Sequence, residues 1–239
     1  MSQQKFSNEL KVEIRQTADG SATLFVPALG EHYHSTHGAR QESEHVFIRA
    51  GLAPLLAAGL GQAGSPPLRL LEIGLGTGLN ALLTLRTAAQ AGAAVAYAGF
   101  ETRSLPAEVV AALAPEWVAQ SVAAGAQFKA LHAAPWSETH PLAPGFLLTK
   151  RLQPVQEAAL PPAGYDLIYF DAFAPDKQPE LWSEAIFQQL YAAAAPGAVL
   201  VSYCAQGQFR RNLRAAGWLT EKLPGPPGKR EMTRARKED

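Results

Sequence analysis

Short apolar runs and helix-spaced apolar positions alternate through the middle and end of the chain. Residues 68–73, 95–100 and 165–170 are continuous enough in apolar character to predict strands of a parallel sheet buried on both faces. Between the first two runs, the apolar residues of 78–90 follow the helical period. Residues 68–101 therefore have the order and length of one βαβ unit, which predicts an α/β fold with a doubly wound sheet.

The flanking segments predict the remaining elements. Alternating positions on either side of Asp19-Gly20 predict an N-terminal β-hairpin, and residues 42–48 begin a helix. We expect residues 1–60 to form an extension packed on a core domain of residues 61–239. Within that domain we expect helices over 107–117, over 179 up to Pro196-Gly197 and over 208–216, and strands over 146–148, 198–204, 218–223 and 231–233.

A glycine turn follows the first core strand. Glu72 precedes three alternate glycines, Gly74, Gly76 and Gly78, and Asn80 stands in the helix that comes next. Glycines at such a turn let the backbone bend tightly and bring its N–H groups close to a ligand. A strand, a glycine turn and a helix in this order predict a nucleotide-type binding site.

The turn departs from two common nucleotide motifs. A dinucleotide fingerprint requires its third glycine at position 79, where this chain has Leu79, and a P-loop requires Lys and Ser or Thr after Gly78. An acid placed before three alternate glycines instead resembles the first motif of class I S-adenosylmethionine methyltransferases. Such a fold commonly ends in an antiparallel hairpin, as the last two predicted strands would form.

Two further acids end predicted core strands. Glu101 follows the second strand, 23 residues after Gly78, where an acid can accept hydrogen bonds from ribose hydroxyls. Asp171 follows the strand of residues 165–170. Because ligands of doubly wound sheets bind at the carboxyl ends of the strands, Asp171 should face the same crevice as the glycine turn. A solvated loop for Glu101 and a helix-capping role for Asp171 are the structural alternatives.

Composition narrows the setting of this fold. The chain has 239 residues, 47 % of them apolar, which is enough for one substantial domain with an appendage. The sequence contains no run of about 18 apolar residues, so no membrane span is expected, and the N-terminus lacks a signal-peptide pattern. Cys204 is the single cysteine, so a reducing cytoplasm is expected. His32, His34 and His37 lie close in sequence without a Cys or Asp at ligand spacing, so we expect a polar loop over a cleft and no metal.

Charge is unevenly distributed although the formal net charge is zero. Residues 205–239 contain nine Lys or Arg and four Asp or Glu. A basic end of this kind is either a solvated surface or a contact for a polyanion.

Several blocks together resemble one family. They are Gly76–Asn80, Asp171–Trp182, Arg210-Arg211, Gly228–Met232 and a Glu42-Ser43 motif. These blocks resemble the MnmD methyltransferases of wobble-uridine modification, whose module also forms the methyltransferase half of bifunctional MnmC. The resemblance covers nearly the whole chain, and the block from Asp171 is its most specific part.

The resemblance implies methyl transfer from S-adenosylmethionine to the primary amine of 5-aminomethyl-2-thiouridine in the tRNA anticodon loop. It implies no FAD, because the oxidoreductase half of MnmC has no counterpart here. Asp171 would be catalytic, and Gln153 would replace the family's acid near the adenine. The donor-side residues would be Glu72, Gly74, Gly76, Gly78, Asn80, Glu101 and Gln153. The acceptor- and tRNA-side residues would be Glu42 and Tyr203, which would line the pocket, and Arg210, Arg211, Lys229 and Arg230, which would hold tRNA phosphates.

Two other functions fit the same residues. One is methylation of a small-molecule or protein amine, in which the basic C-terminal end would be dispensable. The other is a non-catalytic nucleic-acid-binding module, which would not bind S-adenosylmethionine.

Overall fold

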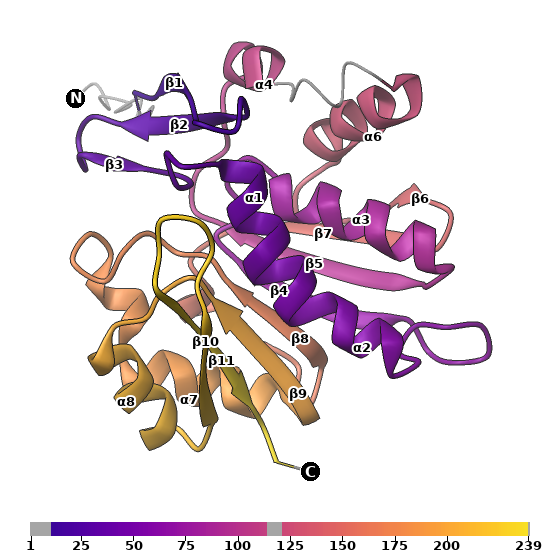
Figure 1. The fold of residues 1–239 in the computed structure, drawn as a ribbon. Helices are drawn as coiled ribbons and strands as arrows, with labels where there is room; N and C mark the ends of the chain where they lie inside the picture. The colour runs from indigo at the N-terminus through magenta and orange to yellow at the C-terminus, as the bar shows by residue number, and fades with distance from the viewer. Residues whose placement is uncertain (1–10, 114–120, 239) are drawn as a thin grey trace, which may run out of the picture.

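An eight-stranded mixed sheet forms the centre of the computed structural model, which describes residues 11–113 and 121–238. Its strand order is β10-β11-β9-β8-β4-β5-β7-β6 (Figure 1). The inner strands run parallel, and each edge is antiparallel. The parallel strands are β4 (Leu68–Ile73), β5 (Val95–Glu101), β7 (Phe146–Leu152), β8 (Tyr165–Phe170) and β9 (Ala194–Ser202); the antiparallel ones are β6 (Thr139–Ala143), β10 (Leu219–Pro224) and β11 (Glu231–Arg236).

Helices cover both faces of this sheet, as a doubly wound fold requires. A continuous rod of three helical segments crosses one face beside α3, while α7 and α8 pack on the other (Figure 1). Leu167 and Tyr169 of β8 belong to the first core, and Ile168 and Phe170 belong to the second. The rod consists of α1 (Ala39–Ser43), the π-helix η1 (Glu44–Leu52) and α2 (Ala53–Ala57); the others are α3 (Leu79–Ala91), α4 (Ala107–Leu113), α6 (Val122–Ala133), α7 (Glu184–Ala193) and α8 (Gly207–Ala215).

The N-terminal hairpin is confirmed and gains a third strand. β1 (Glu13–Gln16) and β2 (Ala22–Val26) pair antiparallel, and β3 (Glu31–His32) adds to β2. The chain then passes through residues 33–38 into the rod. Leu24, Phe47 and Leu52 join the core formed by the sheet and α3, so this part of the chain is packed against the sheet.

The predicted doubly wound class I fold with a terminal antiparallel hairpin is confirmed, but one predicted helix is wrong. The segment from Pro179 is a 3₁₀ turn, η3 (Pro179–Trp182), followed by α7. Ser183 separates them because its extended backbone and side-chain oxygen cap α7 by accepting the N–H of Ile186. Pro196 and Gly197 lie inside β9, where the pairing with β8 shifts register.

The alanine-rich middle contains more structure than its pattern predicts. α6 and β6 were not expected, and neither was the short 3₁₀ turn η2 (Val155–Glu157). Of the helix predicted over residues 107–117, α4 is the described part; its last residues lie outside the described ranges. No helix in the described ranges combines the length and the apolar character needed to cross a membrane.

Candidate active site

A cavity of about 910 Å³ opens at the carboxyl ends of β4, β5, β8 and β9. This is the edge at which doubly wound sheets bind ligands, and the volume suits a small-molecule site. The loop of residues 33–36 borders it, as expected for a polar loop over a cleft. The predicted site residues that line it are Glu42, Gly74, Gly76, Asn80, Glu101, Gln153, Asp171, Tyr203 and Lys229.

The glycine turn and Glu101 are joined directly. The backbone N–H of Gly76 donates to Glu101 Oε2 at 3.0 Å, and the N–H groups of Thr102 and Arg103 donate to Oε1 at 2.7 and 3.1 Å. These bonds hold a half-buried carboxylate at the end of β5, with lone pairs left for a ligand. Gly78 caps the start of α3 in a left-handed conformation, outside the residues that line the cavity.

Glu72 lies beneath the turn and away from the cavity. It is fully buried, accepts from the Tyr97 hydroxyl at 2.6 Å and accepts from Asn80 Nδ2 at 2.8 Å. Burial raises the pKa of the Glu72 carboxyl well above its usual range, against those two hydrogen bonds. The prediction that Glu72 contacts a cofactor directly does not fit this position. It is connected to the site through Asn80.

Asn80 connects this buried carboxyl to Asp171. The same Nδ2 group donates to Asp171 Oδ2 at 2.8 Å, while Asn80 Oδ1 is buried and has no hydrogen-bond partner among the described residues. Asp171 is also held by its backbone, because its N–H donates to the carbonyl of Ile73 at 2.9 Å. β4 and β8 therefore present the glycine turn and the Asp171 carboxyl to the same cavity.

The environment of Asp171 suits proton transfer near neutral pH. Burial, and then the negative charge of Glu42, raise the pKa of Asp171 to about 7. The hydrogen bond from Asn80 and the positive charge of Lys229 oppose that rise. A carboxyl with a pKa close to the working pH can both accept and release a proton, which is the requirement for a general base.

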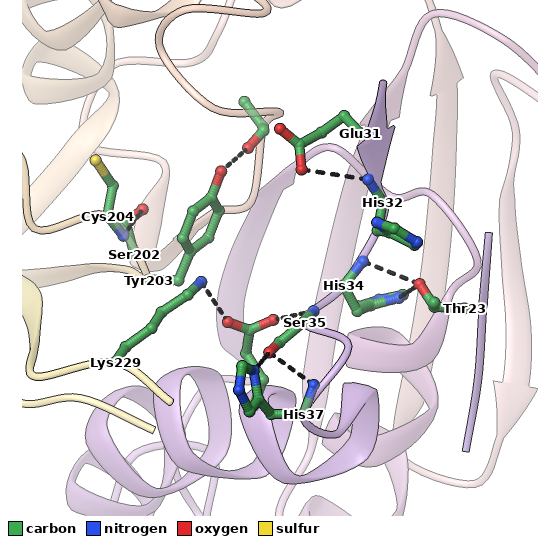
Figure 2. A network of polar contacts seen from close by, with 12 residues as sticks. Thr23, Glu31, His32, His34, Ser35, His37, Ser202, Tyr203, Cys204 and Lys229 are labelled. Atoms are coloured by element: carbon green, nitrogen blue, oxygen red, sulfur yellow. Dashed lines mark hydrogen bonds and ion pairs between the residues drawn. The ribbon is translucent and has the colours of Figure 1, made fainter. Parts of the chain in front are cut away.

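Glu42, Tyr203 and Lys229 lie together in the cavity wall. Lys229 Nζ lies 2.6 Å from Glu42 Oε1 and 4.0 Å from the centroid of the Tyr203 ring. Glu42 Oε2 accepts the N–H of Ser35 at 2.7 Å, and the Tyr203 hydroxyl donates to the carbonyl of Ala172 at 2.8 Å. Figure 2 shows Lys229 reaching from the C-terminal half toward the segment of Ser35, with the Tyr203 ring beside it.

The basic residues separate into buried and exposed groups. Arg210 is 9 % exposed and pairs with Glu231 at 3.1 Å, so the predicted phosphate contact at Arg210 does not fit the structure. Arg211 is exposed and bonded to the side chain of Gln208. Arg230 is exposed and lines a second hollow, which shares Tyr203 and Lys229 with the cavity.

The histidines of the loop of residues 33–38 make structural contacts. His34 is bonded to Thr23, and burial lowers the pKa of its imidazole to about 4. The ring of His37 lies where a side chain at Gly228 would stand. Within residues 11–113 and 121–238, no group of three or more His, Cys, Asp or Glu is arranged to hold a metal ion.

Comparisons with known proteins agree with this fold. Residues 150–238 match the family model described as S-adenosyl-L-methionine-dependent methyltransferase. The bifunctional protein MnmC of Pseudomonas aeruginosa, strain UCBPP-PA14, is 35 % identical over 214 residues, covering 86 % of this chain and 32 % of MnmC. MnmC of Cupriavidus metallidurans is 32 % identical over 223 residues, covering 90 % and 32 %. The crystal structure of MnmC2 from Aquifex aeolicus superposes with a TM-score of 0.71 at 25 % identity, covering 96 % of this chain and 71 % of that one.

The sheet order, the glycine turn and the cavity define a class I S-adenosylmethionine-dependent methyltransferase. Within that class the chain is similar to the methyltransferase part of the MnmC proteins. It spans about a third of the length of the curated relatives it matches, and the match covers their methyltransferase part.

Proposed function

We propose that this chain methylates the primary amine of 5-aminomethyl-2-thiouridine at the tRNA wobble position, giving 5-methylaminomethyl-2-thiouridine. The curated relatives are named for biosynthesis of that product. The observation that carries the proposal is the placement of Asp171, with a pKa of about 7, in the same cavity as the glycine turn and Glu101. One cavity thereby offers a nucleoside site and a proton acceptor.

The donor side fits S-adenosylmethionine. Glu101 lies at the end of β5 and can accept hydrogen bonds from ribose hydroxyls. At Gly76 the absence of a side chain keeps the backbone of the turn clear, since a Cβ there would stand 3.0 Å from the Tyr33 ring. Asn80 lines the cavity at the start of α3, and Gln153 lines it beside η2. When bound, the cofactor supplies a methyl group on a positively charged sulfur.

Glu101 provides a direct test of the donor side. Glu101→Gln should weaken S-adenosylmethionine binding about 10-fold or more, since a hydrogen bond to a charged group contributes about 1.5–3 kcal/mol. Isothermal titration calorimetry measures the affinity, and Glu108→Gln on the exposed surface of α4 is the matched control. Equal affinity in both variants would remove Glu101 from the proposed cofactor site.

The acceptor side needs a neutral amine aligned with the methyl group. A primary alkylamine is mostly protonated at neutral pH and then has no lone pair for the attack. The Asp171 carboxylate can accept a proton from this nitrogen and orient it, while Asn80 holds the carboxylate in place. A wobble base lies in a single-stranded loop, so it can enter the cavity without opening a duplex.

We assign residues 1–60 to an N-terminal extension and residues 61–239 to the methyltransferase domain. The extension contributes Glu42 and the loop of residues 33–36 to the cavity, so both parts serve the acceptor. With tRNA as substrate, the cytoplasm is the proposed location, in keeping with a single buried cysteine that forms no disulfide.

Arg211 and Arg230 are the proposed phosphate contacts, because both guanidinium groups are on exposed residues. The double variant Arg211→Ala/Arg230→Ala should bind tRNA more weakly at every salt concentration. The slope of log K against log salt should fall by about 1 for each phosphate that the protein no longer neutralises. Filter binding from low to high salt measures this slope, with Lys129→Ala, at an exposed position of α6, as the control. An unchanged slope would place the RNA on another surface.

The substrate itself is tested by nucleoside analysis. Purified protein, labelled S-adenosylmethionine and tRNA carrying 5-aminomethyl-2-thiouridine are incubated, and the digested nucleosides are separated by mass spectrometry. We expect label in 5-methylaminomethyl-2-thiouridine alone. Label in another nucleoside, or only in an added free or protein amine, would replace this function with another methyl transfer.

A further inference from the structure

The ammonium group of Lys229 lies in the acceptor side of the cavity. It pairs with a carboxylate and covers an aromatic face, at 2.6 Å from Glu42 Oε1 and 4.0 Å from the Tyr203 ring centroid. The side chains of Glu42 and Lys229 are 8 % and 34 % exposed, so the carboxylate is the buried partner. A buried carboxylate requires a counter-charge, and in the described part of the chain Lys229 is the cation paired with it.

The loop that carries Lys229 is fixed to the N-terminal segment. His45 Nε2 lies 2.8 Å from the carbonyl oxygen of Pro224, where the loop begins. At the other end of the loop, Gly228 lies against the ring of His37. Figure 2 shows His37 beside Ser35, in the segment toward which Lys229 reaches. The pair is therefore a built feature of the cavity wall and not a chance surface contact.

The charges around this pair come from several elements. Glu42 raises the pKa of Asp171 and Lys229 lowers it, so both groups act on the proposed proton acceptor. Burial keeps Tyr203 in its neutral phenol form, because it raises the pKa of that hydroxyl well above the usual range. The other titratable groups facing the pair are Glu31 of β3, His34 and His37 of the following loop, Cys204 after β9, and Arg230 on the same loop.

An acceptor amine enters a site with two carboxyl groups, Glu42 and Asp171. A carboxylate within about 4–6 Å of an amine favours its charged form, typically by 1–3 pKa units. Left uncompensated, Glu42 would hold the acceptor as an ammonium ion, which binds well and does not react. A cation paired with Glu42 cancels the effect of this carboxylate on the pKa of the amine, so that Asp171 can act as the base.

We propose that Lys229 is a built-in counter-cation, which neutralises Glu42 so that the acceptor amine gives its proton to Asp171 and attacks as the free amine. Lys229 is then a positioning residue that acts through Glu42, in place of the phosphate contact predicted from sequence. The inference rests on the proposed function. The ammonium nitrogen loses one proton to the Asp171 carboxylate and then attacks, so that a nitrogen–carbon bond forms while the carbon–sulfur bond of the methyl donor breaks. The sulfur leaves as a neutral thioether, and its positive charge passes to the methylated nitrogen.

The test compares Lys229→Met, Glu42→Gln and the double variant Glu42→Gln/Lys229→Met over a range of pH with tRNA as substrate. Lys229→Met should lower kcat at pH 7 about 10-fold or more, since one pKa unit of the amine is a factor of ten in its free form. Its KM should not rise, because the ammonium form still binds. The loss should shrink as the pH increases toward 10. The double variant should recover kcat at pH 7 to within a few-fold of the wild type.

Controls separate this role from structural and phosphate-binding roles. Lys129→Met makes the same substitution at an exposed position of α6 and should behave as the wild type, and thermal unfolding should show that all variants fold. A raised KM at every pH, or a kcat loss in Lys229→Met that Glu42→Gln fails to rescue, would overturn the inference. Failure of the proposed function is a different result, because the wild type itself would then not methylate the wobble amine.

Discussion

Asp171→Asn should lower kcat about 10²–10⁴-fold, the range contributed by a general base, while S-adenosylmethionine still binds. The amide keeps the size of the side chain and can still accept from Asn80, but it cannot take a proton from the amine. Single-turnover methyl transfer measures the rate, and calorimetry measures the cofactor affinity. Asp176→Asn, on the exposed loop that follows, is the matched control.

The ionisation of Asp171 should also be visible in the dependence of the wild-type kcat on pH. The pKa of Asp171 is raised to about 7, and the group acts in its ionised form, so kcat should increase with pH through this region and decrease below it. In Asp171→Asn this limb should disappear. A near-normal rate in the variant, or an unchanged limb near pH 7, would exclude Asp171 as the base.

Gly74→Ala should disrupt the site and the fold together. Gly74 has φ of +89°, and a Cβ there would stand 2.4 Å from the carbonyl oxygen of Asp171. The clash is with backbone, so the strand end must move and the bond between the Asp171 N–H and the Ile73 carbonyl is strained. We expect loss of cofactor binding and a clearly reduced free energy of unfolding.

Gly92→Ala isolates the clash from the backbone conformation. Gly92 has φ of +66°, and a Cβ there meets nothing within 4 Å. Its substitution should therefore cost only the left-handed conformation, about 1–2 kcal/mol, with cofactor affinity retained. Urea unfolding and calorimetry compare the two variants. Equal losses in both would show that the close approach at Gly74 does not matter.

The core strands were predictable because each is a continuous apolar run that only a doubly covered sheet can bury. β4 and β8 begin and end where their runs do. The break at Ser183 and the helix α6 could not be predicted from the sequence, for opposite reasons. Ser183 interrupts a segment whose apolar period continues through it, while the alanine-rich residues 122–133 have no distinct apolar face. Local hydrogen bonding and packing against α3 decide these elements.

The site residues also divide into those that the sequence could predict and those that it could not. Residues at the carboxyl ends of parallel strands, such as Glu101 and Asp171, were placed together by topology alone. The ion pair of Glu42 with Lys229 joins residues 187 positions apart, so no sequence pattern announces it. The burial of Arg210 against Glu231 likewise depends on how α8 packs against the terminal hairpin of β10 and β11. The sequence shows which residues are charged, but only the structure shows which residues they pair with.

The proposed activity is the addition of one methyl group to a wobble primary amine. Its most direct test offers labelled S-adenosylmethionine and two otherwise matched tRNAs, one carrying 5-aminomethyl-2-thiouridine and one carrying the carboxymethylaminomethyl precursor. We predict one methyl group per tRNA on the primary amine of the first and none on the second. Methylation of both tRNAs, or of neither while the protein binds the cofactor, would contradict the proposed function.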